Sequence, residues 1–215
     1  VQHRSHMTRL VRYVLGQTVH HDLREHPALW TGSCFLDLIG ARVVPGVQPT
    51  LRRDLPRLRW GSLMETVGLP VETLAPCTDD EVCRLGCARL RQACSAAYAV
   101  GPALDDRSKH VVIAKAVIAQ LAERAGLRTA EVARELSTTA RSVRRLVAQR
   151  VYEPLHEATR TRLALEELVQ ATEAYNGRDI VTFLGSEVGT PAEDGRPVGH
   201  MNSYFLEPDN RPEIE

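Results

Sequence analysis

Apolar residues recur every three or four positions over much of this 215-residue chain, which is the spacing of one helix face. The pattern is clearest over residues 109–125, and Gly126, a common helix terminator, follows it. The predicted inward-facing positions of this helix are Val111, Ala114, Ile118, Leu121 and Ala125. The periodicity therefore predicts a mainly α fold built from several helices.

Residues 129–150 carry two short helical patterns that a polar break separates. Their apolar positions are Val132, Ala133 and Leu136 in the first pattern, and Val143, Leu146 and Val147 in the second. Thr129 is the predicted N-cap of the first helix, because its hydroxyl can accept a hydrogen bond from a free backbone N–H. The second helix is expected to be capped by Thr138 or Thr139, both of which follow Ser137 in the break.

This layout resembles the helix-turn-helix of DNA-binding proteins. Ala133 matches the small residue where the two helices of that family cross, and Val143 and Leu146 match its late core positions. Ser137 stands where the family usually has its turn glycine, so a left-handed backbone there costs about 1 kcal/mol. The resemblance implies that the helix over residues 109–125 supports the pair, and that the second helix enters the major groove of double-stranded DNA.

The second helix of the pair is predicted to be basic. Residues 137–152 contain four arginines and no acidic residue, whereas the first helix carries Glu131 and Glu135. This contrast is expected when only the second helix meets phosphates and base edges. The residues expected to contact DNA are Arg134, Thr139, Arg141, Ser142, Arg144, Arg145, Gln149 and Arg150, together with Arg52 and Arg53 from a basic, proline-containing segment. A plain helical hairpin with solvated arginines is the alternative.

The N-terminal part of the chain shows weaker periodicity. Residues 8–18 are expected to form an amphipathic helix with Leu10 and Val14 facing inward and Val11 as a further candidate for that face. Residues 33–39 are expected to form a short apolar element that ends at Gly40. A short helix is expected over residues 62–68. The adjacent His20 and His21 are interpreted as a solvated turn, because neighbouring side chains point to opposite sides and have no acidic partner at helical spacing.

Two stretches, RYV at 12–14 and PALWTGSCFLDLIG at 27–40, resemble a segment of REP-associated tyrosine transposases. Those enzymes cut single-stranded DNA with a tyrosine that lies near a metal-binding histidine pair. The resemblance places Tyr13 at the tyrosine position, which makes it the one candidate nucleophile, and the domain with the histidine pair is expected to be missing. Because a tyrosine of pKa about 10 is a poor nucleophile without a metal, we expect Tyr13 to be a packing residue and the chain to have no enzymatic activity.

The segment 78–81, Thr-Asp-Asp-Glu, is a capping box that predicts a helix running to about residue 100. Cys83, Cys87 and Cys94 lie at i, i+4 and i+11, which predicts one face of small, buried thiols. Together with Cys77 their spacing matches no compact zinc module, so neither a metal nor another cofactor is expected. The odd number of five cysteines fits a reducing cytoplasm.

The C-terminal part begins with a long helix predicted over residues 155–175, which Asn176 and Gly177 are expected to stop. This helix either packs back on the core or pairs with its copy in a homodimer. A short strand is predicted over residues 180–184. Residues 186–215 hold seven acidic residues and two arginines, a net charge of −5 that leaves +5 for residues 1–185 of the neutral chain. This acidic tail is expected to be non-helical and to compete with DNA for the basic face.

The expected organisation has five parts: a remnant of a cloning junction (1–7), a helical and basic region (8–76), a helical domain (77–152) with the helix-turn-helix at 110–150, the long helix (153–177) and the acidic tail (178–215). No window of about 18 apolar residues and no secretory signal is evident, which favours a cytoplasmic, nucleoid-associated protein. The leading hypothesis is a DNA-binding protein derived from a transposase. The alternatives are a protein-interaction module built on the long helix and tail, and a nuclease remnant that uses Tyr13.

Overall fold

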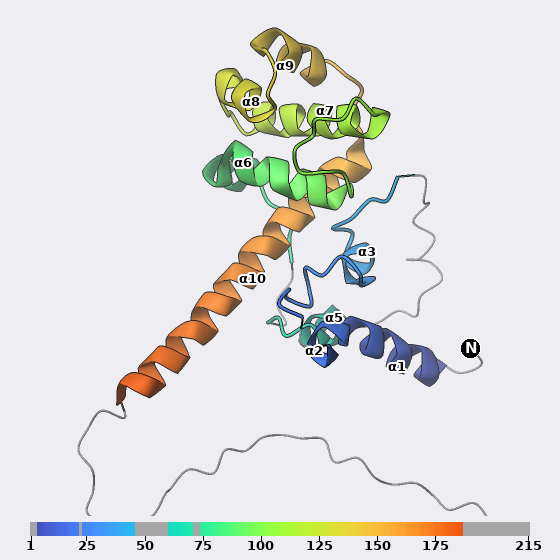
Figure 1. Cartoon of the computed structure of the whole chain (residues 1–215), viewed down its shortest axis with the longest axis vertical. Coiled ribbons are helices and arrows are strands. Elements are labelled where there is room, and N and C mark those ends of the chain that lie inside the picture. The colour runs from blue at the N-terminus through green and yellow to red at the C-terminus, as the bar shows by residue number, and fades with distance from the viewer. Residues whose placement is uncertain (1–3, 22, 46–59, 71–73, 187–215) are drawn as a thin grey trace, which may run out of the picture. The chain divides into compact units, whose positions relative to one another are not determined.

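The computed structural model describes residues 4–21, 23–45, 60–70 and 74–186, which are mainly helical and include no β-strand (Figure 1). The helices are α1 (Arg4–Leu15), α2 (Gln17–His20), α3 (Phe35–Ile39), α5 (Trp60–Thr66), α6 (Asp79–Ala97), α7 (Lys109–Arg124), α8 (Thr129–Glu135), α9 (Ala140–Val147) and α10 (Glu153–Ser186). The prediction of a mainly α fold is confirmed. The chain divides into two units, residues 1–177 and 178–215.

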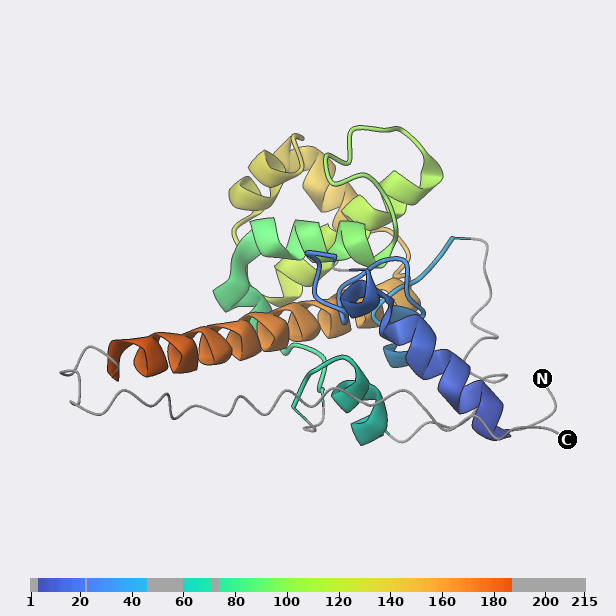
Figure 2. The same cartoon turned by 60° about the horizontal axis from the view of Figure 1, so that its bottom comes forward.

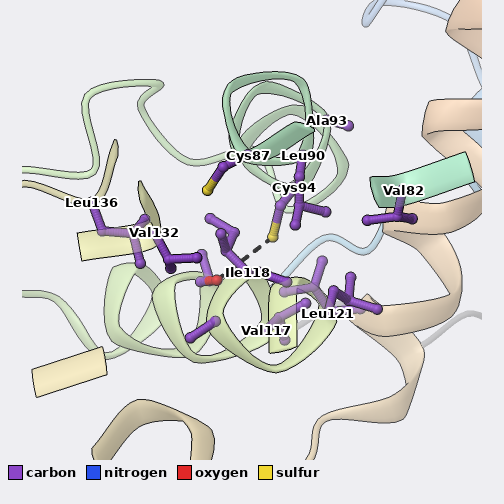
Figure 3. Packing of buried hydrophobic residues seen from close by; sticks show 14 of the residues in the cluster. Val82, Cys87, Leu90, Ala93, Cys94, Val117, Ile118, Leu121, Val132 and Leu136 are labelled. Carbon is purple, nitrogen blue, oxygen red and sulfur yellow. Dashed lines mark hydrogen bonds between the residues drawn. The ribbon is translucent and has the colours of Figure 1, made fainter. Parts of the chain in front are cut away.

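One hydrophobic core of the first unit lies among α6, α7, α8, α9 and the start of α10. In Figure 3 Leu90 and Cys94 of α6 point toward Ile118 and Leu121 of α7. All five predicted inward positions of α7 are buried, so its predicted stripe is confirmed. Burial of each leucine or isoleucine side chain stabilises the fold by about 1.5–3 kcal/mol. Because α8 and α9 contribute side chains to this core, their packing against it holds both helices in place.

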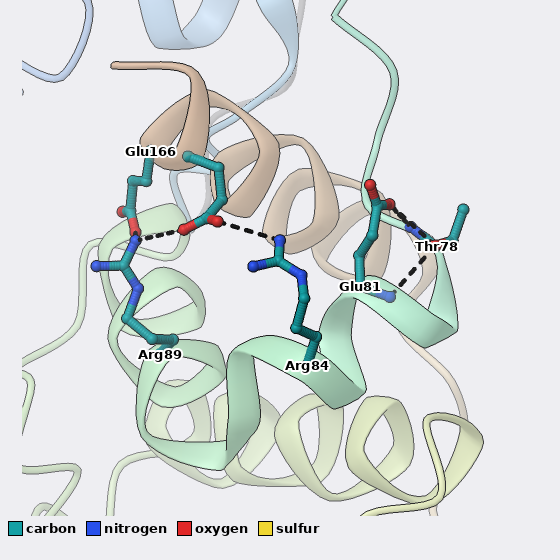
Figure 4. Close-up of polar contacts among 6 residues, drawn as sticks. Thr78, Glu81, Arg84, Arg89 and Glu166 are labelled. Atoms are coloured by element: carbon teal, nitrogen blue, oxygen red, sulfur yellow. Dashed lines mark hydrogen bonds and ion pairs between the residues drawn. The ribbon is translucent and has the colours of Figure 1, made fainter. Parts of the chain in front are cut away.

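Side-chain caps define where α6 and α7 begin. The Thr78 hydroxyl accepts a hydrogen bond from the Glu81 backbone N–H at 3.3 Å, and the Glu81 carboxylate accepts one from the Thr78 backbone N–H at 2.7 Å (Figure 4). The predicted capping box is therefore confirmed. Ser108 caps α7 in the same way, because its hydroxyl accepts from the Val111 N–H at 3.3 Å.

Helix α6 contains a break at Gly86, whose φ of 81° and ψ of 173° are not helical. The break changes the helical phase, so Cys83 is exposed while Cys87 and Cys94 are buried. The prediction that all three thiols share one buried face is wrong for Cys83, because helical spacing does not continue through Gly86. Burial raises the pKa of Cys87 to about 11 and that of Cys94 to about 12, so both stay protonated packing groups at neutral pH.

A second core lies among α1, α3, α5 and the middle of α10. Its largest fully buried side chains are Leu15, Phe35, Leu36, Met64 and Leu165. The short apolar element that ends at Gly40 is confirmed as α3, and Gly40 has the left-handed φ of 76° that a helix end requires. The short helix expected near residues 62–68 is present as α5.

Three expectations about α1 are wrong. The helix begins at Arg4 and not at residue 8. Leu10 is 43% exposed, because the buried face of α1 is formed by Val11 and Leu15 and Leu10 lies about 100° away from Val11 on the helix. Tyr13, expected to pack, is 61% exposed for the same reason.

Helix α10 is longer than predicted, because it continues through Asn176 and Gly177 to Ser186. One glycine in a helix costs only about 1 kcal/mol, which does not end a helix that otherwise satisfies its own backbone groups. The strand predicted over residues 180–184 is therefore wrong, since no partner strand exists among the described residues and the segment is helical. Leu155, Leu163 and Val169 are buried within the same chain, so this helix packs back on its own core.

Candidate nucleic-acid interface

Helices α8 and α9 lie side by side and pack on α7, an arrangement that is visible in both views (Figures 1 and 2). Val132, Ala133 and Leu136 are buried at 2%, 7% and 2% exposure, and Val143 of α9 is buried at 3%. Leu146 and Val147 are half-buried and pack against the same core. The predicted inward faces of both helices are therefore confirmed.

The turn between the two helices is closed by backbone hydrogen bonds. Ser137 N–H donates to Arg134 O at 3.2 Å and Thr138 N–H donates to Ala133 O at 2.8 Å, the pair of bonds that defines a Schellman motif. Ser137 takes the left-handed position of this motif with a φ of 47°. The left-handed backbone considered for Ser137 from the sequence is therefore present. For a residue other than glycine this conformation costs about 1 kcal/mol.

The N-caps of the two helices differ. The Thr139 hydroxyl accepts from the Ser142 N–H at 3.2 Å and lies 3.0 Å from the Ser142 hydroxyl, so Thr139 rather than Thr138 caps α9. The predicted cap at Thr129 is wrong, because the residue with the extended backbone before α8 is Arg128 and no side chain caps it. The cap position follows from where the backbone turns into the helix, and Thr129 already lies inside it.

The exposed side of α9 presents a cluster of guanidinium groups. Arg141, Arg144 and Arg145 lie at i, i+3 and i+4, so they share the helix face opposite the buried Val143. The exposed arginines of residues 128–150 are Arg128, Arg134, Arg141, Arg144, Arg145 and Arg150. Within the described part of the chain, none of these six forms an ion pair.

The acidic residues near this surface do not cancel its charge. Glu135 of α8 accepts a hydrogen bond from Arg91 of α6 at 2.6 Å, so its charge is already paired on the side that faces α6. Glu131 is the other carboxylate of residues 128–150, which leaves a local excess of four positive charges. We name the exposed face formed by the six arginines of residues 128–150 the arginine surface.

The remaining predicted contact residues fall in different places. Ser142 is half-buried and its hydroxyl takes part in the α9 cap. Gln149 is exposed just beyond the end of α9, beside the exposed Arg150. Arg52 and Arg53 lie outside the described residues.

Sequence analysis missed a buried polar pair beneath α9. Gln120 of α7 is 4% exposed, and its side-chain N–H groups donate to Val147 O at 3.3 Å and Gln149 O at 2.9 Å. Its side-chain oxygen lies 2.8 Å from Nε2 of His156 on α10, which is 2% exposed. The signal available in the sequence was a single glutamine within the otherwise apolar run of α7 over residues 116–122.

Tyr13, the candidate nucleophile, lies on α1 with its ring centroid 6.4 Å from that of His20. His21 pairs with Gln17, whose side-chain oxygen lies 2.8 Å from its Nε2 atom. No group of three or more histidine, cysteine, aspartate or glutamate side chains among the described residues is arranged to hold a metal ion.

None of the helices in the described part of the chain combines the length and apolar character needed to cross a bilayer. Comparisons of the chain with known proteins gave no matching family model, no matching curated protein and no matching solved structure.

Proposed function

We propose that the protein binds double-stranded DNA through the arginine surface, with α9 in the major groove and α8 across the backbone. The observation that carries this proposal is the two-sided character of α9. One face is held on α7 by Val143, and the opposite face presents Arg141, Arg144 and Arg145 without a carboxylate partner among the described residues. A helix of this width fits the major groove, and a repeating array of phosphates is the partner that unpaired guanidinium groups match best.

The residues have two expected kinds of contact with DNA. Arg141, Arg144 and Arg145 project from the exposed face of α9, where a bidentate guanidinium–guanine pair adds about 1–3 kcal/mol of base discrimination. Arg128 and Arg134 lie at the two ends of α8 and Arg150 lies beyond the end of α9, where side chains are expected to meet phosphates. We further propose that the bound protein lies on the nucleoid and regulates transcription.

The first test is the salt dependence of binding to a mixed-sequence duplex between about 50 and 200 mM salt, measured by fluorescence anisotropy. We expect a log–log slope of several for the wild type. The Arg144→Ala/Arg145→Ala variant is expected to lose about one to two units of that slope, because each phosphate contact contributes close to one unit.

Arg107→Ala/Lys109→Ala is the matched control, because it removes two exposed positive charges from the loop before α7 and from its first turn. If the control loses as much slope as the α9 variant, the proposal that α9 is the reader is wrong. Absence of wild-type binding at the lowest salt, both in the full chain and after neutralising the acidic residues of 187–215, contradicts DNA binding altogether.

A further inference from the structure

The end of α9 is held by a side chain from another helix. The last carbonyl groups of a helix have no intrahelical partner. Val147 O, at the end of α9, and Gln149 O, just beyond it, both accept from the Gln120 side chain, at 3.3 and 2.9 Å. Gln120 therefore fastens the C-terminal end of α9 to α7, next to the part of the arginine surface formed by Arg145 and Arg150.

The orientation of Gln120 depends on His156. The amide nitrogen of Gln120 is occupied by the two carbonyl groups, so its oxygen is the atom that faces Nε2 of His156 at 2.8 Å. An amide oxygen only accepts hydrogen bonds, so Nε2 of His156 carries the hydrogen and the neutral ring leaves Nδ1 unprotonated. His156 Nδ1 is buried and has no hydrogen-bond partner.

We propose that Gln120 and His156 are a positioning pair for the arginine surface, and that protonation of His156 loosens the end of α9 and weakens DNA binding. The effect on DNA binding rests on the function proposed above. The loosening of α9 does not, because it follows from the contacts of the free protein.

The charges around His156 oppose its protonation. Burial lowers its pKa from 6.5, Arg124 of α7 and Arg160 of α10 lower it further, and Glu153 of α10 acts in the opposite direction. From the end of α9 the pair meets only neutral carbonyl groups, those of Val147 and Gln149. A second ring proton at Nδ1 enters a buried position with no acceptor, so the ring must move to reach water, and Gln120 loses the donor that orients it.

The sign of the pH dependence follows from this. The neutral ring is favoured in the folded protein, so the full stabilisation of the pair is present above pH 6.5. As the pH falls below 6.5 the stabilisation decreases until the lowered pKa of the folded state is reached. The end of α9 is therefore expected to be ordered at pH 7.5 and loosened at pH 5.5.

The test measures amide hydrogen-exchange protection in the full chain without DNA, at pH 7.5 and pH 5.5. The reporters are the N–H groups of Ala148 and Gln149, which donate to Arg144 O and Leu146 O. We expect their protection to be lower at pH 5.5 than at pH 7.5, relative to amides in the middle of α7, because the protonated ring no longer orients Gln120. Between pH 7.5 and pH 5.5 the affinity of the wild type for duplex DNA is expected to fall about fivefold more than that of His156→Gln, a variant whose side chain does not titrate in this range.

His156→Gln is that variant, because a glutamine amide nitrogen stands close to the place of Nε2 and still donates to Gln120 but does not titrate in this range. It is expected to keep the protection of Ala148 and Gln149 at both pH values. His110→Gln, an exposed histidine on α7, is the control that retains the wild-type pH response. Equal pH responses in wild type and His156→Gln overturn the proposal.

Wild-type nitrogen NMR shifts test the pair without any variant. The expected result is the Nε2–H tautomer of His156 at pH 7.5 with a titration midpoint below 6.5, and the Nδ1–H tautomer would overturn the proposal. If protection at the end of α9 falls with acid but no pH gives DNA binding, the positioning pair is supported and the proposed DNA-binding function is contradicted.

Discussion

Ser137 shows how one residue stores strain in the turn of the α8–α9 pair. It has a left-handed φ of 47°, although its side chain makes this conformation unfavourable. Its position in the Schellman motif is set by the bonds from Ser137 and Thr138 back to α8, and by the burial of Leu136 just before it. The packing of α8 and α9 therefore overrides the local preference of the serine backbone.

Ser137→Gly is expected to raise the free energy of unfolding by about 0.5–1 kcal/mol. Glycine relieves the left-handed strain, while its larger entropy in the unfolded chain offsets part of the gain. Urea unfolding of the variant and the wild type measures the difference. Ser137→Ala is the control, because it removes the hydroxyl and keeps the strain, and a gain of the same size in that variant would disprove the explanation.

At the scale of an element, the break in α6 decides which side chains reach α10. In a continuous helix Arg84 and Arg89, five positions apart, would point about 140° apart. With the break at Gly86 both guanidinium groups reach Glu167, at 3.1 and 3.3 Å, and Arg89 also lies 3.6 Å from Glu166 (Figure 4). The break thus joins α6 to α10 through a network of charges.

Gly86→Ala is expected to lower the free energy of unfolding by about 1–3 kcal/mol, because its φ of 81° with ψ of 173° is a conformation that only glycine adopts readily. Outside the neighbouring residues and the backbone of α6 itself, no atom lies within 4 Å of the added methyl group, so the cost is conformational and not a clash. Gly101→Ala is the matched control, since that site is also open and has no positive φ. Thermal or urea unfolding of both variants makes the comparison, and equal stabilities would contradict the role of the break.

At the scale of the first unit, α10 is the element that both hydrophobic cores share. Leu155 and Leu163 belong to the core around α7, and Leu165 and Val169 belong to the core around α3. Each core also places a histidine with a lowered pKa beside it, His156 in the first case, and His26 in the segment before α3. Acid is therefore expected to act on both cores.

The free energy of unfolding is expected to be lower at pH 5.5 than at pH 7.5. Burial lowers the pKa of both histidines from 6.5, so the unfolded chain binds more protons below that value. His26 Nδ1 accepts from the Ala28 N–H at 3.2 Å, a bond that protonation breaks. In the His26→Asn/His156→Gln variant, which keeps an acceptor and a donor at these places, the decrease is expected to be smaller. Urea unfolding at both pH values measures this decrease. A decrease as large as that of the wild type would refute the claim that the two histidines cause it.

The sequence by itself determined the helices of residues 78–147, two of their caps and the outward direction of Arg141, Arg144 and Arg145. These features depend on periodicity and on hydrogen bonds between residues three or four positions apart. Periodicity did not predict the exposure of Cys83, because the non-helical backbone at Gly86 rotates the residues before it relative to those after it. It also did not predict the exposure of Leu10, because an apolar residue gives no local indication of which helix face will be buried.

Only the tertiary structure decided that Gln120 fastens the end of α9 and that His156 orients Gln120. These partners lie 27 to 36 positions apart in the chain. It also decided that α10 passes Gly177 and packs back on its own chain through Leu155 and Val169. The physical reason is the same in both cases. A buried polar atom or an apolar face is satisfied by whatever the fold brings next to it, and residues near it in sequence do not reveal that partner.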